Sequence, residues 1–436
     1  MPKDLPRWPI TMLGFLFPVL WFLGFSFLFI PLIGFCATIV LIRRRHALLP
    51  PAWYLWFGYL VLVAASVVQI DSTGRLIGYA MRVFMVVGAT MIAVYVYSAT
   101  PRSLPTTYVF AMLSLLWVFV VFGGWLGVLL PEVTLQTPAS LVMPNFLMSN
   151  ELVDALVRPR FAEIQQPYGV AEPFIRPAAP FQGANGWGCN IAFLAPIVYR
   201  YIQTISGWRR VTLIAISLSA LVPAAATLNR GLIIGLVLAI VYVAVRSILS
   251  GNIRVAGVAA GVILVGGFAA NALGIVATLS SRLEASGTND TRGALYDEAI
   301  QRTLESPILG YGAPRPSLLL DVSVGTQGHI WNIMVSHGFL ALAFYVSFFL
   351  CMAWFGAKAR PIADGAHVTV IVGVVLMWFY GLDGPQLAVL LIAAALSVRD
   401  ARMVGRPFLE REAPLKATEK PAIGAKLSPL ALERIG

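Results

Sequence analysis

Long apolar segments recur along the whole of this 436-residue chain. A run of about 18 or more apolar residues can cross a bilayer as an α-helix, which satisfies its own backbone hydrogen bonds. A membrane β-barrel would instead show short segments of alternating polarity. Charged residues make up 12% of the chain, about half of their share in an average soluble domain. The sequence therefore predicts an all-α fold, a polytopic transmembrane helical bundle.

The apolar segments predict about 12 transmembrane helices. They cover residues 10–42 as two helices, then 51–70, 75–97, 106–129, 186–205, 210–228, 230–249, 254–277, 328–355, 366–382 and 384–398. Two polar segments, residues 131–184 and 279–327, interrupt this series as large loops. The second of them, between the ninth and tenth helices, contains a helical pattern. We expect residues 1–398 to form one integral membrane domain and residues 399–436 to form a basic, disordered cytoplasmic tail.

The positive charges identify one side of the membrane. If the N-terminus is cytoplasmic, every cytoplasmic connection contains arginine or lysine, as the positive-inside rule requires. These connections contain Arg43–Arg45, Arg102, Arg200, Arg246, Lys358 and Arg399, among others. This arrangement predicts cytoplasmic N- and C-termini and places both polar loops outside the cytoplasmic membrane. Because the positive-inside rule explains the net charge of +11, no nucleic-acid partner is needed.

Arg230 is the first candidate for binding an anionic substrate. It lies where a helix begins at the predicted outer face, after Asn229 as the predicted N-cap. Free backbone N–H groups and the positive end of the helix dipole favour an anion at such a position. The alternative is an anchor whose side chain extends to the lipid headgroups.

Arg292 is the second candidate, in an amphipathic helix of the outer loop that we expect to be capped by one of residues 289–291. The predicted apolar stripe of this helix consists of Tyr296, Ala299, Ile300, Thr303 and Leu304. Arg292 falls on that stripe, so its side chain is expected to face the protein or the bilayer. Arg302 lies off the stripe, four residues after Glu298, and is expected to form a solvated ion pair with it.

Arg75 and Arg82 lie seven residues apart, on one face of the fourth predicted helix. Arg82 would lie about two turns inside the bilayer, where a charge normally faces the bundle interior or a cavity. Both are candidates for binding the substrate. The alternative is that they serve a structural role with a buried polar partner.

His329 is the candidate catalytic residue, in the first turn of the tenth predicted helix. The helix dipole and nearby arginines disfavour the imidazolium form, and a neutral imidazole can act as a general base. The alternative is a histidine that is only hydrogen-bonded at the interface. No acidic cluster has metal-ligand spacing, and Cys36, Cys189 and Cys351 show no ligand or disulfide pattern. We therefore expect no metal and no cofactor.

Three stretches of the sequence follow one another along the chain, all at the predicted outer face. The last two contain Arg230, Arg292 and His329. The three stretches are F-Q-G-A-N-G-W-G-C-N-I-A-F-L-A-P (181–196), T-L-N-R-G-L (227–232), and R-G-A-L-Y-D-E-A-I-Q-R-T-L-E-S-P-I-L-G-Y-G (292–312) followed by Q-G-H-I-W-N-I-M-V-S-H-G-F-L-A-L (327–342). Together they resemble the O-antigen ligase and O-antigen polymerase superfamily of bacterial membrane glycosyltransferases. The resemblance covers about residues 180–350. Asn229 replaces the usual serine, and Tyr296 stands where tryptophan is common.

This resemblance implies transfer of a glycan from a polyprenyl-pyrophosphate carrier to a hydroxyl of a glycan or glycolipid acceptor. The reaction would take place on the outer face of the bacterial cytoplasmic membrane, without a metal, and would invert the anomeric carbon. Arg230 and Arg292, with Arg82, would stabilise the departing pyrophosphate, and His329 would take the proton of the acceptor. One alternative is a polymerase that joins lipid-linked repeat units. An alternative of another class is a transporter or flippase for lipid-linked glycans, although such proteins typically show internal repeats and midplane ionisable residues.

Overall fold

A computed structural model describes residues 4–404 of the chain, except residues 166–172, 273, 275, 279, 281–287, 319, 321, 360–363 and 383. The helices are α1 (Trp8–Leu23), α2 (Phe29–Arg44), α3 (Trp53–Ala65), α4 (Thr73–Ser98), α5 (Thr106–Leu129), α6 (Pro138–Val142), α7 (Asn145–Met148), α8 (Glu151–Val157), α9 (Ala184–Ile202), α10 (Gly207–Ser219), α11 (Leu221–Ala226), α12 (Arg230–Leu249), α13 (Ile253–Ala272), α15 (Thr288–Glu305), α16 (His329–Gly356), α17 (Asp364–Leu376) and α18 (Pro385–Val404), with short 3-10 turns at Ser26–Leu28 and Ser66–Gln69. Two antiparallel pairs of short strands lie in the polar loops: β1 (Ala162–Gln165) with β2 (Phe174–Pro177), and β3 (Arg315–Pro316) with β4 (Ser323–Val324). The prediction of an all-α bundle is confirmed.

A helix lies in every segment that the sequence predicts to be helical and apolar. In the described part of the chain, 7 helices are long and apolar enough to cross a membrane. They are Ser26–Arg44, Thr73–Ser98, Thr106–Leu129, Gly207–Ala226, Arg230–Leu249, Ile253–Ala272 and His329–Gly356. Shorter apolar helices, such as α1 and α17, lie beside them. The chain is therefore a helical membrane protein, and the number of about 12 crossings stays a prediction.

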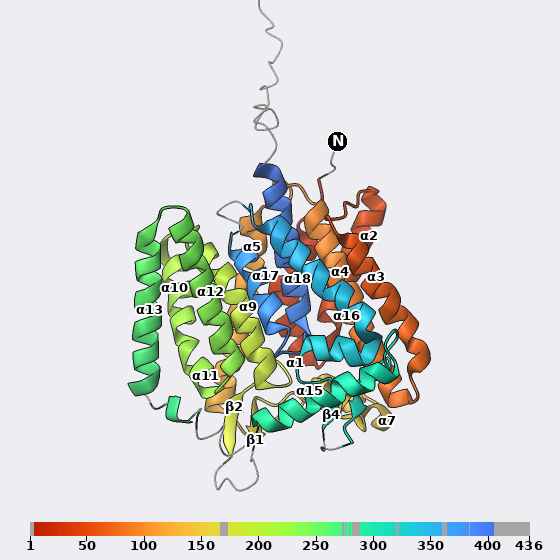
Figure 1. The fold of residues 1–436 in the computed structure, drawn as a ribbon. Helices are drawn as coiled ribbons and strands as arrows, with labels where there is room; N and C mark the ends of the chain where they lie inside the picture. The colour runs from red at the N-terminus through yellow and green to blue at the C-terminus, as the bar shows by residue number, and fades with distance from the viewer. Residues whose placement is uncertain are drawn as a thin grey trace, which may run out of the picture.

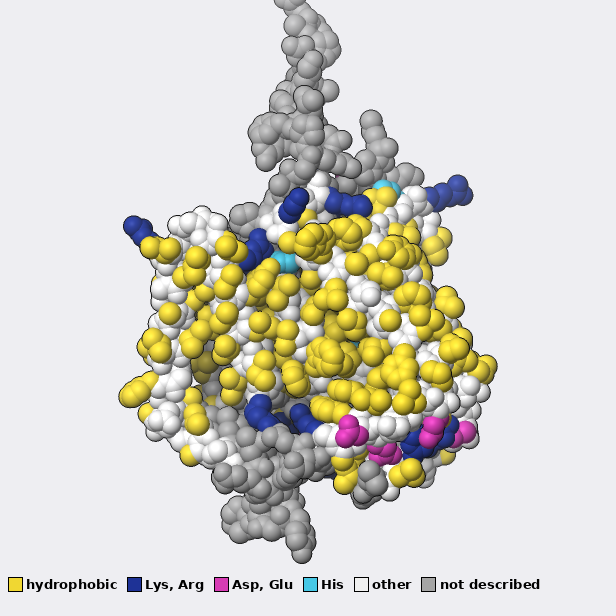
Figure 2. Space-filling model, in the orientation of Figure 1, with side chains coloured by type: hydrophobic (Ala, Val, Ile, Leu, Met, Phe, Trp, Pro, Cys, Tyr) yellow, Lys and Arg dark blue, Asp and Glu magenta, His cyan; other side chains and the backbone are white. Residues whose placement is uncertain are grey.

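The long helices run between two ends of the molecule (Figure 1). The start of α1 and the end of α18 both lie at the upper end in this view, while α15 and the β1–β2 pair lie at the lower end, with α15 across the ends of other helices. Hydrophobic side chains cover the surface between the two ends; basic side chains lie along the upper rim, and basic and acidic side chains together lie along the lower rim (Figure 2). The upper rim, which shows basic but no acidic side chains in this view, would be the cytoplasmic side under the positive-inside rule. We call the lower end the α15 end.

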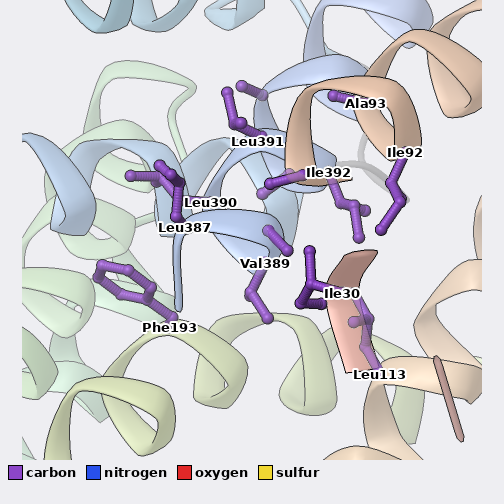
Figure 3. Packing of buried hydrophobic residues seen from close by; sticks show 14 of the residues in the cluster. Ile30, Ile92, Ala93, Leu113, Phe193, Leu387, Val389, Leu390, Leu391 and Ile392 are labelled. Carbon is purple, nitrogen blue, oxygen red and sulfur yellow. The ribbon is translucent and has the colours of Figure 1, made fainter. Parts of the chain in front are cut away.

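Helix α18 forms the centre of the core. Its residues from Leu387 to Val398 are all buried. They pack in one cluster with side chains of α2, α4, α5 and α9, including Ile30, Ile92 and Phe193 (Figure 3). A helix that is apolar on all sides is buried on all sides, because no part of its surface gains from contact with water.

Two predicted boundaries near α18 are wrong. The predicted segment 366–382 stops being helical at Leu376, so the chain before α18 is an irregular connection. Helix α18 continues past the predicted limit at residue 398 to Val404. Arg399, expected in a cytoplasmic turn, is 3% exposed and donates hydrogen bonds to the carbonyl oxygens of Val96 and Leu104. The rest of the predicted tail, residues 405–436, lies outside the described residues.

Helix α16, predicted as one continuous helix, is broken at Gly338, whose φ of 85° lies in the left-handed region. The break frees carbonyl oxygens of the preceding turn. The N–H groups of Tyr311 and Gly312 donate to the carbonyl oxygens of Val335 and Ser336, at 2.9 and 2.7 Å. Backbone approaches backbone so closely here that a Cβ on Gly310 would lie 2.5 Å from Val335 O. The Gly-Tyr-Gly turn therefore supplies hydrogen-bond donors to the carbonyl groups at the break in α16.

Candidate functional site

Arg176, on β2, is the most buried charged group at the α15 end, and we did not predict its role from the sequence. Only 3% of Arg176 is exposed. Its Nε donates to Thr227 O at 2.8 Å and its Nη2 to Asn185 Oδ1 at 3.2 Å. Its Nη1 forms an ion pair with Glu163 Oε2 at 3.4 Å, and Glu163 is its cross-strand partner on β1. Burial lowers the pKa of the Arg176 guanidinium, and the positive charge of Arg292 acts in the same direction.

Glu163, the cross-strand partner of Arg176, also contacts the start of α9. Besides its bond with Arg176, its Oε2 accepts the N–H of Ala184, the first residue of α9, at 3.0 Å. An acid at this position satisfies a free N–H group and interacts favourably with the helix dipole. Glu163 therefore joins the β1–β2 pair to the start of α9.

Asn229 caps α12, as the sequence predicts, because its Oδ1 accepts the N–H of Leu232 at 3.3 Å. The same side chain joins three segments. Its Nδ2 donates to Ala184 O at 3.1 Å, and its Oδ1 accepts a hydrogen bond from the Tyr380 hydroxyl. The starts of α9 and α12 are thereby held together, and Arg230, the first residue of α12, is held next to them and is half-buried.

Arg292 completes a group of three arginines. Arg292 is half-buried on α15, and its charge acts on both Arg176 and Arg230. The three residues come from a strand, a helix start and a helix that lies across the bundle end. We call Arg176, Arg230 and Arg292 the arginine cluster. Glu163 is ion-paired with Arg176 of this cluster. Like charges repel, and an anion bound beside the cluster would offset this repulsion.

The inward placement of Arg292 agrees with the prediction, but the stripe of α15 is shifted. The residues buried against the bundle are Leu295, Ala299 and Thr303, whereas Ile300 and Leu304 are 37% and 57% exposed. The shift arises because the buried side follows the packing of α15 on α16 and β4, which hydropathy alone does not show. The helix also begins at Thr288, before the expected capping residues.

The predicted pair of Arg302 with Glu298 is present at 3.5 Å, but it is not solvated. Glu298 is buried, and it accepts hydrogen bonds from Ser317 Oγ and from the N–H of Leu318. Burial by itself raises the pKa of Glu298. The hydrogen bonds from Ser317 and Leu318, together with Arg302, outweigh burial and lower this pKa. The pair holds the connection after α15 against the helix.

His329 is buried at the start of α16. Its backbone N–H donates to Tyr380 O at 2.8 Å, and its Nδ1 accepts the N–H of Leu382 at 3.2 Å. A neutral imidazole has one acceptor nitrogen, so this bond places the ring proton on Nε2. In this arrangement the ring could donate only through Nε2–H, and acceptance of a proton at Nδ1 requires that the bond with Leu382 opens.

Arg82 lies with His329 and not with the arginine cluster. The two residues line a small cavity of about 20 Å³ together with Asn332 and His337. This volume holds about one water molecule. The prediction that Arg82 faces the interior or a cavity is confirmed. Tyr380 connects this cavity to the arginine cluster, since its carbonyl oxygen binds His329 and its hydroxyl binds Asn229.

Arg75 has a different environment. It forms an ion pair with Asp71, and Arg315 binds the other oxygen of the same carboxylate at 3.0 Å. The hydrogen bond from Arg75 is the main cause that lowers the pKa of Asp71. The interactions of Arg75 therefore hold the start of α4 to the β3 strand, and they do not extend to the arginine cluster.

A larger cavity of about 230 Å³ lies beside the start of α9. Gly183 and Gly186, on either side of Asn185, contribute to its wall, together with the aromatic residue Trp21 and the amide residue Gln386. We call it the outer cavity. In the part of the chain that the structure describes, no group of three or more His, Cys, Asp or Glu residues has the arrangement of a metal site.

Neither a known family model nor a curated protein sequence matches this chain. Its class follows from the fold and the site. The apolar helices and the hydrophobic belt define an α-helical membrane protein, and three arginines converge at one of its ends.

Proposed function

We propose that this protein transfers a glycan from a polyprenyl-pyrophosphate carrier to a hydroxyl of a glycan or glycolipid acceptor. The observation that carries this proposal is the convergence of Arg176, Arg230 and Arg292 at the α15 end, where hydrophobic surface gives way to polar loops. A pyrophosphate attached to a lipid has its charge at this depth. Its oxygens can accept charge-assisted hydrogen bonds from several guanidinium groups at once.

The arginine cluster would stabilise the pyrophosphate leaving group of this reaction. The acceptor oxygen attacks the anomeric carbon, and the bond from that carbon to the pyrophosphate oxygen breaks with its electron pair going to the pyrophosphate. Negative charge develops on that leaving group, and preorganised cations stabilise it more in the transition state than in the ground state. Attack from the opposite side inverts the anomeric carbon. The positive charge of the cluster would supply the electrostatic stabilisation that a metal ion supplies in other transferases.

His329 remains the candidate that takes the proton from the acceptor hydroxyl. Its cavity lies next to Tyr380, one side chain away from Asn229 and the arginine cluster. The bond of Nδ1 with Leu382 would have to open for this role. If it stays closed, His329 positions a substrate oxygen through Nε2–H instead.

The location of the site favours a transferase over a transporter. Transport sites usually lie near the middle of the membrane, between two halves of the fold. The arginine cluster is built from one helix start, one strand and a helix lying across one end of the bundle. With the upper end cytoplasmic, this end faces outward from a bacterial cytoplasmic membrane.

The test uses purified protein in nanodiscs, with EDTA, and lipid-linked glycan extracted from a strain that lacks the gene. Transfer to an acceptor fraction of the same strain should fall by roughly 10²–10³ in Arg230→Ala and in Arg292→Ala, as it does when one preorganised donor is removed. Arg158→Ala is the matched control, because Arg158 lies outside the cluster and is paired with Asp154. Full transfer by both cluster variants would rule out this function for the arginines.

A second experiment separates a ligase from a polymerase by the surface glycan of the deletion strain. Loss of polymerisation leaves single units attached to the acceptor, whereas loss of ligation leaves polymer on the carrier.

A further inference from the structure

The outer cavity differs in chemistry from the arginine cluster beside it. Among the described residues that line it, none carries a charge. The wall combines aromatic rings, amide side chains, glycines and prolines, such as Trp21 and Gln386, with Ser26 and the aliphatic residues Met85, Ala155 and Leu156. A neutral cavity with these groups has no charge that attracts a pyrophosphate.

Two polar atoms of this wall are buried and have no hydrogen-bond partner among the described residues. They are Nε1 of Trp21, a residue that is 1% exposed, and Oε1 of Gln386, a residue that is 5% exposed. Buried polar atoms are nearly always hydrogen-bonded in folded proteins, and an unpaired one indicates an absent partner. The indole N–H can only donate, and the amide oxygen can only accept. A ligand with hydroxyl groups satisfies both atoms, since each hydroxyl donates and accepts.

The volume excludes a single water molecule as the only occupant. About 10–15 Å³ of such volume is enough for one water, and the cavity measures about 230 Å³. An alkyl chain would fill this space but leave both polar atoms unpaired. An anion would meet no cation among the described residues of the wall. The occupant that fits is neutral, ring-sized and rich in hydroxyl groups.

The cavity and the arginine cluster share the first turn of α9. Gly183 and Gly186 face the cavity, and Asn185 between them accepts a hydrogen bond from Arg176 at 3.2 Å. Gly186 also makes room for Gln386, because a Cβ at this position would lie 3.3 Å from Gln386 Nε2. One ligand can therefore place a charged group on the arginines and a neutral group in the cavity.

We propose that the outer cavity binds a sugar ring of the glycan substrate. In this site Gln386 Oε1 accepts a hydrogen bond from one sugar hydroxyl, and Trp21 Nε1 donates to another. The aromatic side chains pack against the apolar face of the ring. This inference rests on the proposed function, because it takes the substrate to be a glycan whose pyrophosphate binds to the arginine cluster.

The experiment compares binding of two probes to the protein in nanodiscs: undecaprenyl pyrophosphate, and the lipid-linked glycan extracted from the deletion strain. We expect Gln386→Leu and Trp21→Phe each to weaken binding of the glycan-bearing probe by about 3- to 10-fold, as loss of one neutral hydrogen bond does. Neither variant should change binding of undecaprenyl pyrophosphate. Gln203→Leu, at the far end of α9, is the control with unchanged binding of both probes. Melting temperatures verify that the variants are folded.

The outcomes separate this inference from the proposed function. If Arg230→Ala has no effect on either probe, the proposed function fails. If Arg230→Ala weakens both probes while Gln386→Leu and Trp21→Phe change neither binding nor the KM for the acceptor, the cavity does not bind sugar. If the two cavity variants raise the KM for the acceptor and leave donor binding unchanged, the sugar in the cavity belongs to the acceptor.

Discussion

Tyr296 of α15 stacks on Trp331 of α16, with the ring centroids 4.1 Å apart and the planes inclined by 13°. Trp331 lies two residues after His329, and Tyr296 lies one helical turn after Arg292. The stack therefore fixes the helix that contributes to the arginine cluster onto the helix that contains the candidate base. Trp331 thus has a packing role between α15 and α16.

Tyr296→Ala should lower transfer more than it lowers stability. Loss of an aromatic pair costs about 0.5–1.5 kcal/mol beyond lost burial, and α15 would then no longer hold Arg292 at a fixed distance from Arg230. Tyr296→Trp should retain most of the activity, because it restores a stacked ring. Ile300→Ala, on the exposed side of the same helix, is the control. Thermal unfolding and turnover measured on the same samples test this prediction, and equal activity of all three variants would contradict it.

Substitution of Arg176, but not of Glu163, should weaken binding of undecaprenyl pyrophosphate. Arg176→Met removes a charge-assisted hydrogen bond worth about 1.5–3 kcal/mol and should weaken binding at least tenfold. Glu163→Gln keeps an acceptor for the N–H of Ala184 and removes the negative charge paired with Arg176. Its affinity should be equal to or higher than that of the wild type. A loss of affinity in Glu163→Gln as large as in Arg176→Met would show that the pair serves only the fold.

His329→Gln distinguishes the two roles of this histidine. A general base contributes about 10²–10⁴ to the rate, and glutamine cannot replace it, although glutamine can donate a hydrogen bond from its amide group. If the bond of Leu382 with Nδ1 persists during the reaction, His329→Gln should retain far more activity than His329→Ala. If Nδ1 takes the proton, both variants should lose activity equally. Initial rates at saturating donor and acceptor measure the difference.

Gly338→Ala should destabilise the protein strongly. A non-glycine residue at φ 85° and ψ 174°, a region essentially restricted to glycine, costs roughly 1–3 kcal/mol, and a Cβ here would also lie 2.6 Å from the carbonyl carbon of Ile308. The contact between the broken helix and the turn after α15 would have to open. Gly257→Ala on α13 is the matched control, since a Cβ there meets no atom within 4 Å. The melting temperature in detergent should fall for Gly338→Ala and stay the same or rise for Gly257→Ala.

The sequence by itself determines the features that depend on neighbouring residues. Apolar runs place the helices, because a segment of this length in lipid must satisfy its hydrogen bonds internally. Asn229 caps α12 through a bond to Leu232, three residues away. The helical repeat relates Arg292 to Tyr296 and Ala299 on one face of α15, and Ala299 is buried. Each of these inferences needs only local geometry.

The tertiary structure decides which distant residues meet. Arg176 has no distinctive pattern around it, and only the β1–β2 pairing and the start of α12 bring it to Arg230. The break at Gly338 depends on the turn at residues 310–312, and the tautomer of His329 depends on the N–H of Leu382. Contacts between residues far apart in the chain are set by packing, which local propensity and hydropathy do not encode. The arginine cluster is for this reason a property of the folded chain, although two of its three members could be named from the sequence.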